Sequence, residues 1–177
     1  KKLLQNEAFM LTYGDGLSNI NISKLIKHHK GAPLLRMLGI GYKLTIFDGL
    51  SQLQKLFEEN TFWAKGRNKE QICKMLLNST VVVSVWSQNQ LIGFGRATSD
   101  LVFRAVLWDV VIASDRQGIG LGKLIVEAIL TNKKIKCVEK VYLMTTNSSD
   151  FYKQLGFEIN KKQTLLMLNK TKTDHLD

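Results

Sequence analysis

A glycine-rich turn between a long apolar strand and an amphipathic helix constrains the fold of this chain most. The apolar run from Val102 to Ile112 predicts a buried strand, and apolar residues recur at helical spacing from Gly118 to Asn132. Between them lies the segment Gln117-Gly118-Ile119-Gly120-Leu121-Gly122. Glycines at such a junction leave backbone N–H groups accessible, and the start of the helix adds a positive partial charge. The turn therefore predicts a binding site for an anion such as phosphate.

Two common phosphate-binding motifs do not fit this turn. A P-loop, G-x-x-x-x-G-K-[ST], would place its first glycine at Gln117 and its hydroxyl residue at Leu124. A dinucleotide fingerprint starting at Gly118 would need a small residue where Lys123 stands. It would also need a parallel sheet, whereas the preceding strands look like antiparallel hairpins. The pattern that remains is Q/R-x-x-G-x-G/A, spanning residues 117–122.

Alternation and turn residues predict the remaining elements. Strands are expected at 42–47, 80–86, 91–97, 102–112, 141–144 and 165–168. Helices are expected around 50–57, with Asp48 or Ser51 near the cap, and at 68–76, 118–132 and 148–155. Antiparallel hairpins followed by one strand–helix–strand crossover predict a mixed α/β (α+β) fold. Its central sheet is mixed and mostly antiparallel, with helices on both faces.

The chain divides into one large domain and two terminal extensions. Residues 1–41 contain several glycines and the only proline, and we interpret them as an arm with one short helix near 20–28. Residues 42–170 form the predicted domain, and 171–177 a tail. The apolar fraction of 45% is ordinary for a globular protein. No apolar run reaches the roughly 18–20 residues that span a bilayer, and no secretory signal is visible. We therefore expect no membrane partner.

The net charge of +10 raises the question of nucleic-acid binding. The cations are 20 Lys and 5 Arg, spread along the whole chain and not interleaved with aromatic residues that could stack on bases. This pattern favours solvated lysines that attract anions over a nucleic-acid surface. No metal site is expected, because Cys73 and Cys137 lack ligand spacing and the adjacent His28 and His29 diverge on any regular element.

A second motif lies one helix and one strand downstream of the glycine turn. The segment is Asp150-Phe151-Tyr152-Lys153-Gln154-Leu155-Gly156-Phe157. A helix C-capped by Gly156 would explain its glycine and aromatics, but not its spacing from the first motif. Together the two motifs resemble the GNAT acetyltransferase superfamily, over roughly Tyr42 to Leu168. The segments 91–100 and Trp108-Asp109-Val110 are similar to plastid and cyanobacterial members, which implies the plastid stroma or a prokaryotic cytoplasm.

The resemblance implies an N-acetyltransferase that uses acetyl-CoA and no metal. By this likeness, the backbone of Val110, Val111 and Ile112 should pair with pantetheine as an added strand. Asn147 could contact the cofactor arm, although it stands closer to the tyrosine than the superfamily's usual asparagine. The residues expected to hold the diphosphate are Gln117, Gly118, Ile119, Gly120, Leu121, Gly122 and Lys123.

Tyr152 is the expected general acid, because a phenol of pKa about 10 can protonate the departing thiolate. The alternative is a core phenol with a satisfied hydroxyl. The general base is a separate question. Asp109 stands in an apolar strand, where a lone carboxylate would be costly, so it is a candidate base or amine anchor. Pairing with Arg96 or Arg104 is the alternative for Asp109, and Asp150 is a weaker candidate that could instead cap its helix.

The acceptor carries no motif. Related plastid enzymes acetylate protein lysines and N-termini, and some accept arylalkylamines, so a protein amine is expected first and a small amine second. A third hypothesis is a non-catalytic basic regulatory module that keeps the fold. The intact glycine turn together with Tyr152 favours catalysis, since a binding module needs neither. The sequence leaves the oligomeric state open.

Overall fold

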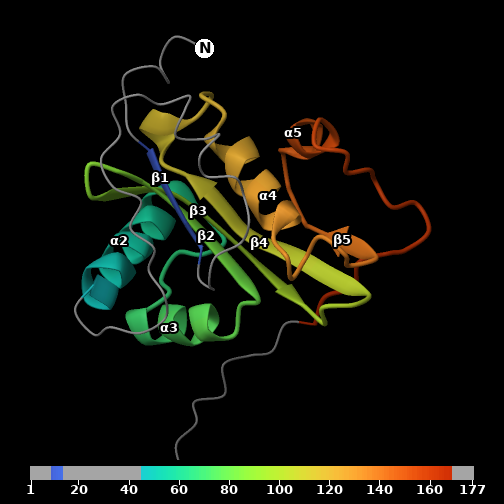
Figure 1. Ribbon diagram of the computed structural model, residues 1–177, viewed down its shortest axis with the longest axis horizontal. Helices are drawn as coiled ribbons and strands as arrows, with labels where there is room; N and C mark the ends of the chain where they lie inside the picture. Colours follow the sequence, from blue (N-terminus) through green and yellow to red (C-terminus); the bar gives the residue numbers. More distant parts are fainter. Residues whose placement is uncertain (1–8, 14–44, 169–177) are drawn as a thin grey trace, which may run out of the picture. The chain divides into compact units, whose positions relative to one another are not determined.

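The computed structural model describes residues 9–13 and 45–168, and divides the chain after Met144 into two compact units. Its elements, shown in Figure 1, are β1 (Phe9–Tyr13), α2 (Thr45–Asn60), α3 (Lys69–Leu77), β2 (Val81–Ser87), β3 (Gln90–Ser99), β4 (Arg104–Ile112), the 3₁₀ turn η2 (Ser114–Arg116), α4 (Leu121–Thr131), β5 (Lys140–Tyr142) and α5 (Ser149–Lys153). All five strands belong to the first unit, and α5 belongs to the second.

The described strands form one sheet in the order β1-β2-β3-β4-β5. The first three pairings are antiparallel. β5 pairs parallel to β4, through Arg104↔Lys140, Ala105↔Val141 and Val106↔Tyr142. Parallel neighbours need a crossover, and α4 supplies it between β4 and β5. The mixed, mostly antiparallel sheet expected from the sequence is confirmed.

Helices cover both faces of this sheet, and the central strand β3 shows how. Phe94 meets the Phe57 ring of α2 edge-on, with ring centroids 5.5 Å apart. The adjacent Gly93 and Gly95 instead face Ile125 of α4. Because neighbouring residues of a strand point to opposite faces, α2 and α4 lie on opposite sides of the sheet (Figure 1). The helices on both faces are also confirmed.

α4 approaches β3 so closely that only glycine fits beneath it. A Cβ added to Gly95 would lie 2.5 Å from Cγ2 of Ile125 and 3.4 Å from Cδ1 of Ile129, and both isoleucines are fully buried. A Cβ on Gly93 would lie 3.1 Å from Cδ1 of Ile125. These two glycines therefore set the depth at which α4 packs on the sheet.

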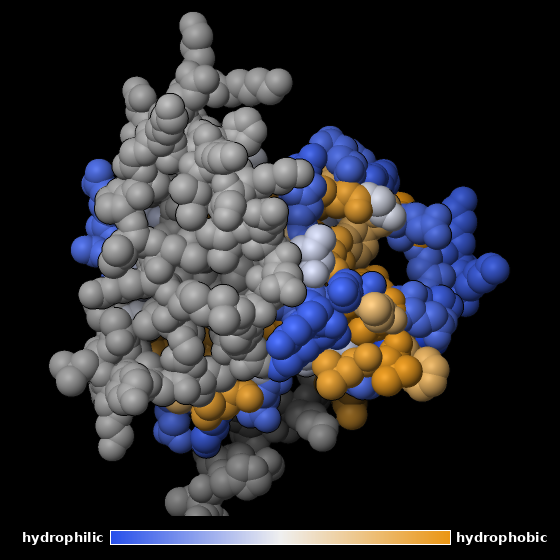
Figure 2. All heavy atoms as spheres, in the orientation of Figure 1, coloured by the Kyte–Doolittle hydropathy of each residue, from blue (hydrophilic) through white to orange (hydrophobic). Residues whose placement is uncertain are grey.

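Asp100 determines where β4 begins. Its carboxylate oxygen accepts hydrogen bonds from the backbone N–H groups of Val102, Phe103 and Arg104, at 2.8–2.9 Å. The bond from Arg104 is the main reason that the pKa of Asp100 lies below its ordinary value. These bonds fold residues 101–103 into a turn, so β4 starts at Arg104 and not at Val102 as predicted. The apolar Leu101, Val102 and Phe103 remain exposed. Figure 2 shows hydrophobic side chains at the surface beside hydrophilic ones.

α3 begins where its sequence predicts. The Asn68 side chain accepts from the N–H of Gln71 at 2.8 Å, and the Gln71 side chain accepts from the N–H of Asn68 at 3.1 Å. This reciprocal capping box satisfies two backbone donors at the start of the helix. The helix buries Ile72 completely, which joins it to the core beneath α2.

The strand predicted at 42–47 is wrong for residues 45–47, which form the first turn of α2. The caps expected at Asp48 or Ser51 are wrong for the same reason, because both residues lie inside the helix. The short alternating pattern is outweighed by a helical apolar face that buries Leu53, Leu56 and Phe57 in the core. Residues 42–44 lie outside the described part of the chain.

The strand predicted at 165–168 is also wrong. These residues have no regular secondary structure, and their four apolar side chains are 72–87% exposed. A strand of four residues is stable only beside a partner, and the sheet of the described residues ends at β5.

Part of the predicted N-terminal arm joins the sheet. Phe9–Tyr13 forms β1 and pairs antiparallel with β2, from Phe9↔Ser87 to Tyr13↔Val83. The domain boundary at 41/42 stays a prediction. The helix expected near 20–28, the pair His28-His29 and the tail 171–177 lie outside the described residues. Within the described ranges, no helix has the length and apolar character needed to cross a membrane.

The packing of α4 on β3 leads to a stability prediction. We expect Gly95→Ala to lower the free energy of unfolding by about 1–3 kcal/mol, because the new methyl group must displace the buried Ile125. Gly49→Ala is the control. Its Cβ would meet Trp86 at an ordinary 4.0 Å within α2, where alanine should stabilise the helix by up to about 1 kcal/mol. Urea unfolding followed by circular dichroism measures both. Equal stability of Gly95→Ala and the parent would show that the contact is not tight.

Candidate active site

β4 contains a bulge at Asp109. Phe94 pairs with Val111 and Arg96 with Trp108, so two residues of β4 stand opposite the single residue between Phe94 and Arg96. Asp109 has φ +53°, in the left-handed region that residues other than glycine rarely adopt. Such a bulge bends a strand and redirects the backbone groups that follow it. The middle of β4 is therefore irregular, just before the residues predicted to meet the cofactor.

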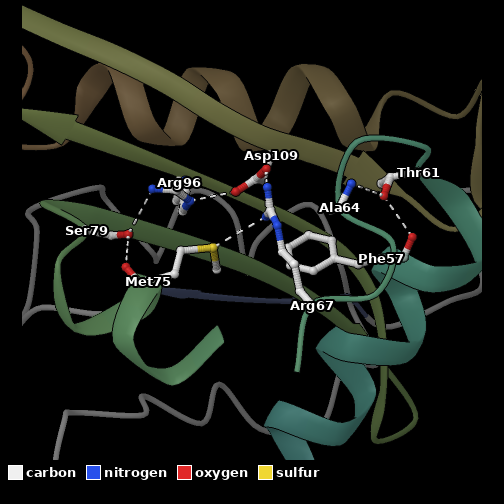
Figure 3. A network of polar contacts seen from close by, with 8 residues as sticks. All are labelled: Phe57, Thr61, Ala64, Arg67, Met75, Ser79, Arg96 and Asp109. Atoms are coloured by element: carbon white, nitrogen blue, oxygen red, sulfur yellow. Dashed lines mark hydrogen bonds and ion pairs between the residues drawn. The ribbon is translucent and has the colours of Figure 1, made fainter. Parts of the chain in front are cut away.

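The Asp109 carboxylate lies in an ion-pair cluster with Arg67 and Arg96, which we call the Asp109 cluster (Figure 3). Its Oδ2 lies 2.7 Å from Nε of Arg96, and its Oδ1 lies 3.2 Å from Nη1 of Arg67. The Asp109 side chain is 4% exposed, so the two guanidinium groups offset the burial of its charge. Of the two pairings considered from the sequence, the one with Arg96 is confirmed.

The pairing of Asp109 with Arg104 is not found. Arg104 Nη1 lies 3.1 Å from Glu139 Oε2 on the surface, at the start of β4. The second partner is Arg67, which the sequence reasoning missed. Arg67 lies in the loop between α2 and α3, 42 positions before Asp109 in the chain, and no local spacing signals a contact over that distance.

Neighbouring side chains hold both guanidinium groups in place. Arg96 lies over the Trp108 ring, 5.7 Å from its centroid, and its Nη1 lies 3.5 Å from Ser79 Oγ. Arg67 lies over the Phe57 ring at 5.4 Å, and its Nη1 lies 3.6 Å from Met75 Sδ. Stacking on an aromatic face leaves the edge of a guanidinium free for hydrogen bonds. The Asp109 cluster therefore joins β3, β4 and the loop before α3, and Phe57 of α2 and Met75 of α3 support it (Figure 3).

The edge of β4 that faces β5 is paired only at its beginning. β5 ends opposite Val106, and no described strand pairs with residues 107–112 on that side. We call this stretch the outer edge of β4. Ala113 N–H donates to Ile92 O on β3 at 2.9 Å. Backbone groups alternate along a strand, so those of Val110 and Ile112 point to the outer edge and those of Val111 point to β3.

The side chain of Gln117 supports this orientation. Its Nε2 donates to the carbonyl oxygen of Ile112 at 3.1 Å, so the turn after β4 reaches back to the strand. The start of that turn is held by Asn60 of α2, whose Oδ1 accepts from the N–H of Ser114 at 2.8 Å. The glycine turn is thus tied to β4 on one side and to α2 on the other.

Two glycines of the turn have left-handed backbone conformations. Gly118 has φ +77° and Gly120 has φ +94°, and a Cβ on either would meet nothing within 4 Å. Backbone conformation, and not crowding by protein atoms, therefore requires glycine here. Gly120 is also the N-cap of α4, and no side chain caps that helix. Accessible N–H groups at the start of an uncapped helix fit a diphosphate.

The other predicted contacts of the turn surround these glycines. Leu121 is buried and anchors the first turn of α4, while Ile119 and Gly122 are half-buried. Lys123 is exposed, and its Nζ lies 3.7 Å from Glu127 one helical turn later. The segment thus combines one apolar anchor, polar backbone groups and an exposed lysine whose positive charge suits a phosphate.

Tyr152 lies on α5 in the second unit, among aromatic rings. Its ring contacts Phe151 and Phe157 edge-on, at centroid distances of 4.9 and 5.8 Å. Gly156, with φ +88°, reverses the chain after the helix, and Phe157 N–H donates to Tyr152 O at 3.1 Å. Burial raises the pKa of Tyr152 above its ordinary value, so the phenol keeps its proton at neutral pH. Among the described residues, its hydroxyl has no hydrogen-bond partner.

Asn147 and Asp150 lie in the same unit and are exposed. Asn147 Oδ1 is 3.3 Å from Ser148 Oγ. The predicted N-cap role of Asp150 is wrong, because the cap position is Ser148 and Asp150 lies in the first turn. Asp150 Oδ1 accepts from Lys153 Nζ at 2.8 Å, and this bond holds the pKa of Asp150 below its ordinary value. A lowered pKa makes Asp150 a weaker base.

Metal ligands do not gather anywhere in the described part of the chain. No group of three or more His, Cys, Asp or Glu residues there could hold an ion. Both cysteines are free thiols, Cys73 half-buried and Cys137 exposed. The polar groups brought together are instead backbone amides, arginines and one buried carboxylate.

Solved structures share this fold. An acetyltransferase described as belonging to the GNAT family, from Xanthomonas campestris pv. campestris, aligns with a TM-score of 0.62 and 20% identity, over 74% of this chain and 91% of that one. The aminoglycoside N-acetyltransferase AAC(6')-Iy, solved in complex with CoA, aligns with a TM-score of 0.58 and 10% identity, over 93% and 96%.

Sequence comparisons agree with the fold. A family model described as an acetyltransferase (GNAT) domain matches residues 78–159. The N-acetyltransferase ycf52 of Pyropia yezoensis is 32% identical over 79% of this chain and 82% of its own length. A ycf52-like N-acetyltransferase of Prochlorococcus marinus is 35% identical over 64% of each chain, and the histone acetyltransferase TAP1 of Glycine max is 34% identical over 52% of this chain and 45% of its own. The chain therefore belongs to the GNAT family of N-acetyltransferases.

Proposed function

We propose that this acetyltransferase moves an acetyl group from acetyl-CoA to a primary amine of a protein, either a lysine side chain or an N-terminus. One observation carries the donor half of the proposal: the outer edge of β4 is followed, after a short turn that contains two left-handed glycines, by the uncapped start of α4. A donor that combines an amide-rich arm with a diphosphate matches this sequence of backbone groups.

The glycine turn is the proposed diphosphate site. Gly118 and Gly120 let the backbone approach the phosphates without a Cβ between them, and the start of α4 contributes its positive partial charge. The contacting residues are Gln117, Gly118, Ile119, Gly120, Leu121, Gly122 and Lys123. The Gln117 side chain already donates one hydrogen bond to the carbonyl oxygen of Ile112, so Gln117 also stabilises the shape of the turn.

The outer edge of β4 is the proposed pantetheine site. Of the three predicted residues, Val110 and Ile112 direct their N–H and C=O groups to that edge, while Val111 uses its groups toward β3. The pantetheine amides therefore pair with Val110 and Ile112, and the Val111 side chain belongs to the core beneath. The Val110 amide, next to the bulge, is the proposed donor to the thioester oxygen. Asn147 is a proposed contact of the cofactor arm.

Tyr152 is the proposed acid. Attack of the amine on the thioester carbonyl forms a C–N bond and a tetrahedral intermediate. Collapse of this intermediate to an amide breaks the C–S bond, and the departing thiolate needs a proton that a neutral phenol can donate. Burial keeps the Tyr152 phenol protonated across the working pH range. The amine must be neutral before attack, and a lysine of pKa about 10.4 is mostly protonated at pH 7, so a base or water chain removes a proton. Asp109 as that base stays a prediction.

Names of relatives bear on the acceptor. The Glycine max relative is named as a histone acetyltransferase, which supports a protein amine. The aminoglycoside enzyme shares only the fold, at 10% identity, so a small amine is the second candidate. The ycf52 relatives in Pyropia and Prochlorococcus support a plastid stroma, or the cytoplasm of a prokaryotic relative, as the proposed location.

A panel of acceptors tests the function directly. With acetyl-CoA as donor and free CoA as readout, we expect turnover of peptide lysines or peptide N-termini to exceed that of arylalkylamines and polyamines. Faster turnover of a small amine would replace the proposed acceptor. Absence of turnover with every amine, together with salt-sensitive DNA binding, would favour a non-catalytic basic module.

The glycine turn makes a separate prediction about donor binding. We expect Gly120→Asp to weaken acetyl-CoA binding at least about 100-fold, because a carboxylate would stand where the diphosphate binds. Gly120→Asn is the matched control, since asparagine has nearly the same size and also tolerates positive φ. It should bind acetyl-CoA more tightly than the aspartate variant. Calorimetry measures both, and circular dichroism checks the fold. Normal binding to a folded Gly120→Asp protein would place the diphosphate elsewhere.

Tyr152 makes the prediction about catalysis. We expect Tyr152→Phe to lower kcat by about 10²–10⁴-fold while the Kd for acetyl-CoA stays within about twofold, since only proton donation is lost. Tyr142→Phe removes a phenol from β5 and serves as the control with parent activity.

The pH profile gives a second readout for Tyr152. Activity should rise with pH as the amine loses its proton, and should fall only when Tyr152 loses its own. Burial raises the pKa of Tyr152, so this fall should lie above the ordinary phenol value of about 10. A fall in kcat centred below pH ~9 that disappears in Tyr152→Phe would contradict this environment, and unchanged kcat in that variant would remove Tyr152 from the reaction.

A further inference from the structure

The bulge in β4 needs a stabilising partner, and its own side chain supplies one. Asp109 adopts φ +53° in the middle of β4. Conformations of this kind persist where the surrounding contacts determine them, and they gather at functional sites. Aspartate tolerates the left-handed region better than most residues, but tolerance alone does not select it. The contacts of the carboxylate provide that selection.

Those contacts connect the bulge to two other segments. Arg96 extends from β3, the strand that pairs with the bulge, and Arg67 extends from the loop between α2 and α3. Each arginine takes a different carboxylate oxygen, at 2.7 and 3.2 Å. The Asp109 side chain therefore bridges the two arginines, and this bridge holds the bulge against β3 and the α2–α3 loop.

The loop that carries Arg67 is itself held at several points. Gln54 Nε2 of α2 donates to the carbonyl oxygen of Arg67 at 3.0 Å, and Gly66 N–H donates to Glu58 Oε2 at 3.0 Å. Within the same loop, Thr61 Oγ1 accepts from the N–H of Ala64 at 3.3 Å (Figure 3). The position of Arg67 is thus determined by α2, so the Asp109 cluster connects the helical layer to the bulge.

The same contacts occupy both oxygens of the Asp109 carboxylate. Each oxygen faces a guanidinium group, and the side chain is 4% exposed. An incoming amine would therefore have to displace a buried ion pair before it could reach either oxygen.

We propose that Asp109 is a positioning residue that acts with Arg67 and Arg96, and is not the general base. The ion pairs hold the bulge, and the bulge directs the backbone N–H of Val110 to the outer edge of β4. This inference rests on the proposed function, in which that edge receives the thioester. Loss of the cluster moves the acyl group relative to the amide that polarises it, while the diphosphate remains held by the glycine turn.

Three substitutions of Asp109 separate the two roles. Asp109→Asn keeps the shape, one acceptor oxygen and the tolerance of positive φ. Asp109→Gly keeps the backbone freedom and deletes the side chain, and Asp109→Ala deletes it and adds a Cβ that opposes positive φ. We expect kcat to fall in the order parent, Asn, Gly, Ala, with Asn within about tenfold of the parent and Ala lower by about 10²-fold. The Kd for CoA should stay within about threefold.

The pH profile is the readout that a base would change and a positioning residue would not. With Asp109→Asn, the rising limb of kcat/KM against pH should keep its midpoint. If Asp109 were the base, Asp109→Asn would lower kcat/KM by about 10²–10⁴-fold, and the rising limb of the pH profile would disappear. Loss of that limb would overturn the proposal, and so would equal activity of the Asn, Gly and Ala variants.

Arg67 tests the same idea from the loop, where the side chain is 31% exposed and replacement spares the core. We expect Arg67→Ala to lower kcat about 10-fold or more and Arg67→Lys to recover part of it, at unchanged Kd for CoA. Arg104→Ala, which removes the surface pair with Glu139 at the start of β4, is the matched control with parent activity. Parent activity in Arg67→Ala would overturn the proposal. A parent protein that neither binds CoA nor turns over would instead refute the proposed function.

Discussion

The arrangement of the first unit depends on the contact between Gly95 of β3 and Ile125 of α4. Because Gly93 and Gly95 carry no side chain, α4 lies close against β3, and Ile125, Val126 and Ile129 of the helix are fully buried. The helix can then serve as the short crossover from β4 to the parallel β5. Its first residue follows the glycine turn directly, so the packing that stabilises the fold also places an uncapped helix start at the end of β4.

The irregular centre of β4 has a different origin. A regular strand would continue its pairing through Gly95, but β4 has one extra residue opposite Gly95 and therefore forms a bulge. Asp109 in this bulge has a left-handed backbone, and its carboxylate pairs with Arg67 and Arg96. Burial of this carboxylate would be unfavourable alone, and becomes tolerable because both guanidinium groups are themselves held, by aromatic rings and by the α2–α3 loop. The polar interior of this sheet is thus one carboxylate between two arginines, which links β3, β4 and the loop between α2 and α3.

Local signals in the sequence were enough for the hairpins, the capped start of α3, the glycine turn and α4. Each depends on residues within one turn or one strand pair, such as Asn68 with Gln71. Predictions failed where distant contacts decide the outcome. Residues 45–47 alternate like a strand but extend a helix whose face is buried in the core, and residues 165–168 look like a strand but have no described partner. No local pattern in the sequence predicts the bulge or the contact of Arg67 with Asp109. Asp109 itself could be singled out, because a lone carboxylate in an apolar strand is unusual.

The short pairing of β4 with β5 also bears on the solubility of the chain. After Val106 the outer edge presents backbone donors and acceptors that no described strand satisfies, and such an edge is a template for adding a strand from another molecule. A pantetheine arm lying along Val110 and Ile112 would occupy the same groups. On the proposed function, the acyl donor is therefore also a protective ligand: it favours the folded state by mass action and competes with edge-to-edge aggregation, so the cellular supply of CoA would help set how much of this protein stays soluble.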